Sequence, residues 1–184
     1  MFNQSKNPRV KRSLVKITMA TYELLRNADL RDLTVTAIAT KAGVTRKTFY
    51  RNFGDVIDVL DYGFYSFILP FYQNPHCDTY YDFVLSTLAF ASEHKDVLLM
   101  AKKQSQFSLL EGLGVKYLPN THYIQSVVAR HQSEGFEGTF CLIVASLTCG
   151  LLEEWVDDDF RQSPAEVASK GVEAIAALAE GQAL

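Results

Sequence analysis

Cysteine is scarce in this sequence, and its few occurrences follow no recognisable spacing. The chain of 184 residues holds three cysteines, Cys77, Cys141 and Cys149, and none of them belongs to a C-x-x-C pair. An odd number without such spacing argues against a disulfide framework and against the usual structural zinc sites. We therefore expect free, buried thiols and no metal site.

Long hydrophobic runs are also missing. No apolar stretch approaches the roughly 18 to 20 residues of a membrane-spanning helix, and the first residues lack the apolar core of a signal peptide. These absences predict a cytoplasmic protein that does not interact with a membrane.

The residue combinations that carry catalysis or bind cofactors are absent as well. There is no glycine-rich phosphate loop, and no nucleophile lies in a recognisable pattern with a base. His76, Cys77 and Asp78 are neighbours in the chain, and such neighbours rarely converge on one metal ion. The acidic run 157–159 ends an expected helix, where it is unfavourable for the helix dipole and indicates a solvated helix terminator. The sequence therefore predicts neither an enzyme nor a cofactor-binding protein.

Alternating polar and apolar residues, which would predict strands, do not occur in convincing runs, and helical signals cover nearly the whole chain. We predict an all-α fold of about nine helices, with a helix-turn-helix head in residues 1–54 and a larger helical body in residues 55–184. The expected helices cover residues 9–26, 35–42, 46–52, 56–69, 79–94, 96–110, 120–132, 140–155 and 164–180.

Charge is distributed unevenly between these two parts. The net charge of −3 hides a basic head, because residues 1–51 hold eleven lysines and arginines against three acids. Residues 52–184 hold seven basic and eighteen acidic residues. A basic segment on an acidic body indicates a polyanionic partner for the head, although a solvated basic face without a partner has the same composition.

The stretch from Thr34 to Phe53 predicts two short helices around a glycine turn. Apolar residues recur at helical spacing before Gly43, which can adopt the positive φ of a tight turn. Thr45 has the side chain of an N-cap for the second helix. On that helix Phe49 and Phe53, four residues apart, would face inward and leave a cationic, hydrogen-bonding outer face. Phosphates and base edges require such a face.

The body has fewer diagnostic signals. Asp55 is expected to cap the fourth helix and Pro70 to stop it, while residues 111–119 are expected to form a loop. The stretch 140–155 has no polar face, so it is either a central core helix or covers a partner. Ser163 and Glu166 form a capping box at the start of the last helix.

The stretch from Thr34 to Phe53, with the helix before it and the Asp55 cap after it, resembles the TetR family of transcriptional regulators. The resemblance covers roughly the first third of the chain. It implies a homodimer that binds a palindromic operator in double-stranded DNA, typically as a repressor, and that a small molecule releases from it. Two positions depart from the common pattern, because many members have a lysine where Val56 stands and a small residue where Lys47 stands.

The expected DNA surface comprises Thr34, Thr36, Thr45, Arg46, Lys47, Thr48, Tyr50 and Arg51. Tyr50 could instead be a packing aromatic, and Thr34 and Thr45 could be caps alone. A second interpretation is a helical protein-interaction module whose basic head docks on another protein or on an acidic surface.

Aromatic residues of the body suggest a pocket for a small apolar or aromatic effector, or else an ordinary core. This set comprises Phe64, Phe67, Phe71, Tyr80, Phe83, Phe90, Phe107 and Tyr123. The expected dimer interface pairs the last two helices of each subunit through Leu147, Leu151, Trp155, Gly171, Ala174, Ile175 and Leu178. Trp155 could instead anchor those two helices to each other within one chain.

Overall fold

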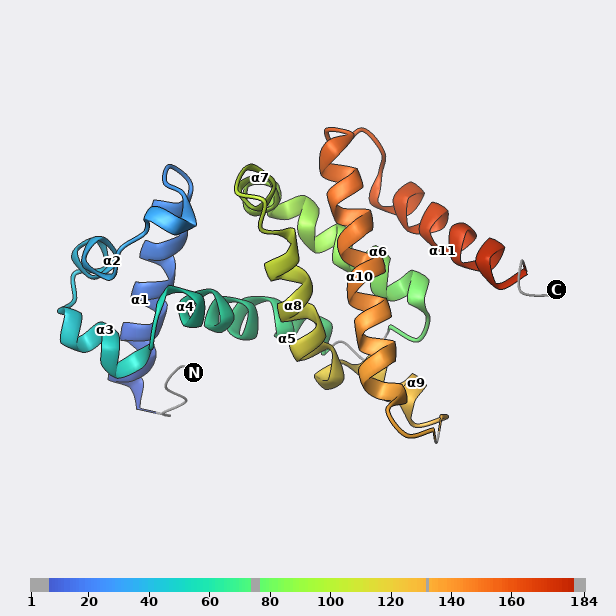
Figure 1. The fold of residues 1–184 in the computed structure, drawn as a ribbon, viewed down its shortest axis with the longest axis horizontal. Helices are drawn as coiled ribbons and strands as arrows, with labels where there is room; N and C mark the ends of the chain where they lie inside the picture. Colours follow the sequence, from blue (N-terminus) through green and yellow to red (C-terminus); the bar gives the residue numbers. More distant parts are fainter. Residues whose placement is uncertain (1–6, 74–76, 132, 181–184) are drawn as a thin grey trace. The chain divides into compact units, whose positions relative to one another are not determined.

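The computed structural model describes residues 7–73, 77–131 and 133–180, and within these ranges every regular element is helical (Figure 1). The expectation of an all-α fold is confirmed. The chain divides into two compact units, Met1–Ile68 and Leu69–Leu184. Three residues that bear on the sequence expectations lie outside the described residues. They are Lys6 of the basic head, the metal candidate His76, and Gln132 at the end of an expected helix.

The first unit is built around one long helix. Its elements are α1 (Pro8–Leu25), η1 (Leu30–Asp32), α2 (Val35–Ala42), α3 (Arg46–Asn52), α4 (Val56–Gly63) and the π-helix η2 (Phe64–Ile68). Helix α1 packs on α2, α3 and α4, and its residues Leu14 and Ile17 contribute to a core shared with Ile38, Phe49 and Val59. Each of the short helices is thus held by burial of one face, since helices of seven or eight residues are marginal by themselves.

The first unit extends beyond the boundary that we expected at residue 54, because α4 packs on α1. A close approach marks that contact. A Cβ at Gly63 would lie 2.7 Å from the Tyr22 hydroxyl oxygen, and burial raises the pKa of Tyr22 to about 12. The expectation that Pro70 stops this helix is wrong. The chain stays helical through η2 into α5 (Leu69–Tyr72), and a π-helical segment can accommodate a proline because its hydrogen bonds are already shifted.

Gly43 forms the turn between α2 and α3 with φ +64° and ψ 38°, the left-handed region. The amide of Val44 donates to the carbonyl oxygen of Ala39 across this turn, as in a Schellman motif. No side-chain clash would oppose a larger residue, because a Cβ at Gly43 would meet no atom within 4 Å. The requirement for glycine is therefore one of backbone conformation alone.

The variant Gly43→Ala is expected to lower the free energy of unfolding by about 1–2 kcal/mol, the cost of a left-handed conformation for an L-residue. Gly43→Asn should cost less, because asparagine tolerates this region. Urea denaturation followed by circular dichroism would measure both values. Equal stability of the alanine variant and the parent would contradict the assignment of strain to this turn.

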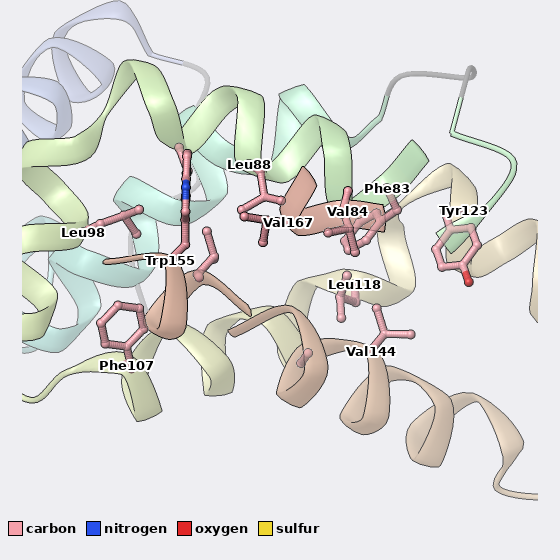
Figure 2. Packing of buried hydrophobic residues seen from close by; sticks show 14 of the residues in the cluster. Phe83, Val84, Leu88, Leu98, Phe107, Leu118, Tyr123, Val144, Trp155 and Val167 are labelled. Atoms are coloured by element: carbon pink, nitrogen blue, oxygen red, sulfur yellow. The ribbon is translucent and has the colours of Figure 1, made fainter. Parts of the chain in front are cut away.

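The second unit packs its helices around a larger core. Its elements are α5, α6 (Tyr80–Glu93), α7 (Lys95–Lys103), α8 (Phe107–Tyr117), η3 (Leu118–Asn120), α9 (His122–Val128), α10 (Phe136–Asp157) and α11 (Pro164–Glu180). Helix α10 packs mainly on α8, and α11 packs mainly on α6. Figure 2 shows residues of the core between these helices, with Leu98, Phe107 and Trp155 at one end and Tyr123 at the other.

Two sequence expectations for this unit are wrong. The single helix expected over residues 96–110 is broken between α7 and α8, where Ser105 adopts a positive φ of 53°. The loop expected over residues 111–119 is instead mostly the second half of α8. Its glycines misled the expectation, because the packing of α8 on α10 outweighs the modest helix penalty of glycine.

Helix α10 is a core helix of this unit. The expectation that no apolar stretch approaches the length of a membrane-spanning helix does not hold for α10, because by length and composition alone it could cross a membrane, with a mean hydropathy of 1.5 over its most apolar window. Its residues Cys141, Val144, Leu152 and Val156 are buried in the core of the unit. Its residues Leu142, Ile143 and Leu147 are exposed, so one face of this apolar stretch lies in the core and another face remains on the surface.

Candidate nucleic-acid interface

Helix α3 is fixed in place from both of its ends. The Thr45 hydroxyl oxygen accepts a hydrogen bond from the Thr48 amide at 3.1 Å and lies 3.0 Å from the Thr48 hydroxyl oxygen. The expectation that Thr45 is the N-cap is confirmed. At the other end the Asn52 side-chain amide donates to the Thr48 carbonyl oxygen at 2.7 Å. Local hydrogen bonds thus define a helix too short to be stable alone.

The inner face of α3 is anchored by aromatic residues. Phe49 has no exposed surface, and its ring packs on Phe53 with 5.8 Å between centroids. Phe53 in turn contacts Tyr62 of α4 in a T-shaped arrangement. The inward orientation expected for Phe49 and Phe53 is confirmed, and it fixes which side chains of α3 face outward.

The outer face of α3 carries three cations and an aromatic. Arg46, Lys47, Arg51 and Tyr50 are exposed, and 53% of the Tyr50 surface is accessible. Among the described residues, no ion pair is recorded for these three cations. Lys41 differs, because its ammonium group lies 2.8 Å from the Glu23 carboxylate and lowers the pKa of Glu23 below its ordinary value. The charge on α3 is therefore available to an external anion.

The start of α2 adds hydroxyl and amide groups. Thr34 is the N-cap, and its hydroxyl oxygen accepts from the Ala37 amide at 3.1 Å. Thr36 is exposed in the first turn of the same helix. Unpaired amides at a helix start attract anions such as phosphate. The eight residues expected on a DNA surface thus all lie on α2, α3 and their caps, with Thr48 half-buried and the others exposed.

The aromatic residues expected to line an effector pocket are divided between the two units. Phe64 and Phe67 belong to the first unit. In the second unit, ring contacts join Phe83 to Tyr123 at 5.5 Å, Tyr80 to Tyr123 at 6.5 Å and Phe71 to Phe90 at 4.9 Å. Phe83 and Tyr123 are buried in the core of the second unit, whereas 37% of the Phe71 surface is exposed.

A cleft of about 450 Å³ lies in the second unit, against α8 and α10, and of the expected pocket residues only Phe107 lines it. The sequence analysis missed the other lining residues. Helical spacing on α8 and α10 could have indicated that Glu111, Ser146 and Glu153 line a common site. Glu111 was not considered because it lay in an expected loop.

The residues expected at a dimer interface differ in their exposure. Leu147, Ala174 and Leu178 are exposed, Ile175 is half-buried, and Leu178 has 68% of its surface accessible. Leu151 and Gly171 face each other within the chain, because a Cβ at Gly171 would lie 2.6 Å from a Leu151 methyl carbon.

Trp155 requires a correction as a dimer-interface residue. It is 2% exposed, it packs on Phe160 and its indole nitrogen donates to the Gln162 carbonyl oxygen at 2.8 Å. A side chain so enclosed by its own chain has almost no surface left for a partner. Trp155 is the internal anchor that the alternative interpretation described.

Comparisons with known proteins point to one family for the first unit. Residues 17–55 match the family model described as bacterial regulatory proteins, tetR family. No curated protein sequence matches the chain significantly.

Two solved structures are similar to nearly the whole chain. One is the dihydroxyacetone kinase operon activator DhaS, with 17% identity, a TM-score of 0.55 and coverage of 90% of this chain and 95% of that one. The other is the transcriptional regulator FadR from Bacillus subtilis in complex with stearoyl-CoA, with 13% identity, a TM-score of 0.53 and coverage of 86% and 95%. At such identities the likeness concerns the fold.

Proposed function

We propose, from the premise that this chain belongs to the tetR family of bacterial regulatory proteins through its N-terminal domain, that it regulates transcription by binding DNA with helix α3. The observation that carries the proposal is the outer face of α3, where Arg46, Lys47 and Arg51 are exposed and no ion pair within the described residues is recorded for them. Cations that neutralise phosphates of a polyanion release its condensed counterions, and this release supplies most of the affinity of such contacts.

Each side chain on this surface has a proposed role. Arg46, Lys47 and Thr48 enter the major groove together with the N-terminal end of α3, where Thr45 caps the helix. Tyr50 and Arg51 hold the DNA backbone, and Thr34 and Thr36 present the start of α2 to a phosphate. Lys47 extends farther than a small residue would, so base contacts at this position are a feature of this chain.

The protein acts as a homodimer in this proposal. Exposed apolar residues on α10 and α11, among them Leu147, Ala174 and Leu178, support a shared face between two copies. A two-fold dimer places two copies of α3 in successive major grooves about 34–36 Å apart, so the operator is palindromic. The protein works in the cytoplasm, where it meets its operator.

The variant Leu178→Ser is expected to weaken the dimer roughly tenfold, because it removes apolar surface that dimerisation would bury. Leu99→Ser is the matched control, since Leu99 is an exposed leucine on α7, outside the proposed face. Sedimentation equilibrium would measure both dissociation constants. A monomeric parent at micromolar concentration, or an equal loss in the two variants, would count against this interface.

The second unit provides the regulatory input. A small molecule binds there and changes the separation of the two heads, which spoils simultaneous docking and releases the repressor from the operator. The fold shared with FadR, whose structure holds stearoyl-CoA, supports a ligand-binding role for this unit.

In vitro selection from random double-stranded DNA tests the proposal. We expect the parent protein to enrich an inverted repeat with half-sites about one helical turn apart. Binding to this DNA should persist at moderate salt, whereas sequence-independent binding falls steeply with salt. Recovery of unrelated sequences with only salt-sensitive binding would instead favour docking of the basic head on another acidic partner.

A further inference from the structure

The cleft of the second unit has a wall that combines charged and hydroxyl side chains with apolar surface. It is lined by Lys102, Ser105, Phe107, Ser108, Glu111, Ser146, Cys149, Gly150 and Glu153. These residues come from the end of α7, from the connection between α7 and α8, from α8 and from one face of α10, so segments far apart in the sequence build the cleft. At Gly150 the cleft is open, because a Cβ there would meet no atom within 4 Å.

The charges in this cleft do not cancel. The ammonium group of Lys102 lies 2.8 Å from the carboxylate of Asp157, which is outside the lining set. No ion pair within the described residues is recorded for Glu111 or Glu153. With the lysine already paired, two carboxylates leave the cleft negative.

One of the two carboxylates is oriented by the fold. The Ser146 hydroxyl on α10 donates a hydrogen bond to the carboxylate of Glu111 on α8. This bond crosses the cleft wall and fixes the position of the charge. Burial, followed by the charges of Glu111 and Glu153, raises the pKa of the Cys149 thiol to about 12, so both carboxylates act on the same region of the wall.

The lining selects among classes of ligand. An anion would meet two carboxylates, and an apolar molecule would cover the carboxylates and the hydroxyls of Ser105 and Ser108 without offering them hydrogen bonds. Among the residues that the structure describes, no three His, Cys, Asp or Glu side chains are grouped to hold a metal ion. An organic cation with several N–H donors satisfies both the charge and the hydroxyl oxygens, and a volume of about 450 Å³ is in the usual range for small-ligand sites.

We propose that the cleft between α8 and α10 binds a small aliphatic amine, with its ammonium groups held by Glu111 and Glu153 and its remaining N–H groups by the serine hydroxyls. The site lies wholly within the second unit and does not depend on DNA binding by the first. Binding of the amine can therefore be measured separately from the DNA binding of the proposed function.

Isothermal titration of the full chain with 1,4-diaminobutane, in the absence of DNA, tests the site. The parent is expected to bind with a dissociation constant below about 1 mM and to bind more weakly as salt is raised. The neutral analogue 1,4-butanediol should bind at least tenfold more weakly. Equal binding of the diol, or no saturable heat with the diamine up to 10 mM, would overturn the proposal.

Variants assign the binding to the two carboxylates. Glu111→Gln keeps an oxygen for Ser146 but removes the charge, and both it and Glu153→Gln are expected to weaken diamine binding about tenfold. Glu154→Gln is the matched control, because Glu154 is an exposed glutamate beside Glu153 on α10 and does not line the cleft. Circular dichroism checks that each variant is folded. Unchanged affinity in folded Glu111→Gln and Glu153→Gln, or an equal loss in Glu154→Gln, would show that the diamine binds elsewhere.

Discussion

Replacing Arg46 and Arg51 together with alanine is expected to lower the affinity for the selected operator at least about 30-fold. Each side chain lies on the exposed outer face of α3, and the loss of one charged contact to DNA costs about 1–3 kcal/mol. The two positions lie more than one helical turn apart, so their effects should add approximately. Fluorescence anisotropy with labelled operator would measure the change.

The salt dependence of operator binding should also change when these arginines are replaced. Each lost phosphate contact reduces the slope of log affinity against log salt by about 0.9. We assign Arg51 to the backbone and Arg46 to the groove, so the single variant Arg51→Ala should reduce the slope by about this amount. If the slope changed in Arg46→Ala but not in Arg51→Ala, Arg46 would be the residue on the backbone and Arg51 the residue in the groove.

Lys41→Ala is the control for charge alone. It removes one positive charge from the same unit, but this charge is already paired with Glu23 at 2.8 Å. An exposed ion pair contributes about 0–1 kcal/mol, so the variant should stay folded and should bind the operator nearly as tightly as the parent. An equal loss of affinity in Lys41→Ala and in the double variant would mean that net charge, rather than the face of α3, governs binding.

Phe49→Ala is expected to lower the free energy of unfolding by about 3–5 kcal/mol, the usual cost of removing a fully buried phenylalanine ring. Phe49 has no exposed surface and packs on Phe53, which connects α3 to α4 through Tyr62. Its removal leaves a cavity in a small core with little capacity to collapse. Urea denaturation would measure the loss, and operator binding should fail with it.

The neighbouring residue offers a matched control for this experiment. Tyr50→Ala removes a ring of similar size, but one with 53% of its surface exposed. Its effect on stability should stay within about 1 kcal/mol, whereas its affinity for the operator should fall. A large loss of stability in Tyr50→Ala would support the alternative that Tyr50 is a packing aromatic.

The local features of this protein could be predicted from the sequence. Thr45, Asp55 and Ser163 were expected as caps, and each accepts a hydrogen bond from the amide three residues further on. The turn at Gly43 and the inward orientation of Phe49 were likewise expected. All of these depend on side chains within four residues of each other, so spacing in the sequence determines them.

The sequence misjudged features that depend on long-range packing. Pro70 and the glycines of α8 are helix breakers by local preference, yet both segments are helical. Trp155 lies on the same helix as exposed Leu147, and its burial depends on packing in the core and on contacts with Phe160 and Gln162. Local propensities of about 1 kcal/mol per residue are outweighed wherever a helix buries a face in a core.

By itself, the sequence determined that this protein is helical, that its basic charge is gathered in the first third and that this part contains a helix-turn-helix with a cationic outer face. Only the tertiary structure decided that α4 belongs with the first unit, that the aromatic residues of the body pack on each other, and that Glu111 and Glu153 share a cleft. The physical reason is the range of the interactions involved. Caps, turns and helix faces arise within a few residues, whereas a core or a cleft exists only after distant helices have packed.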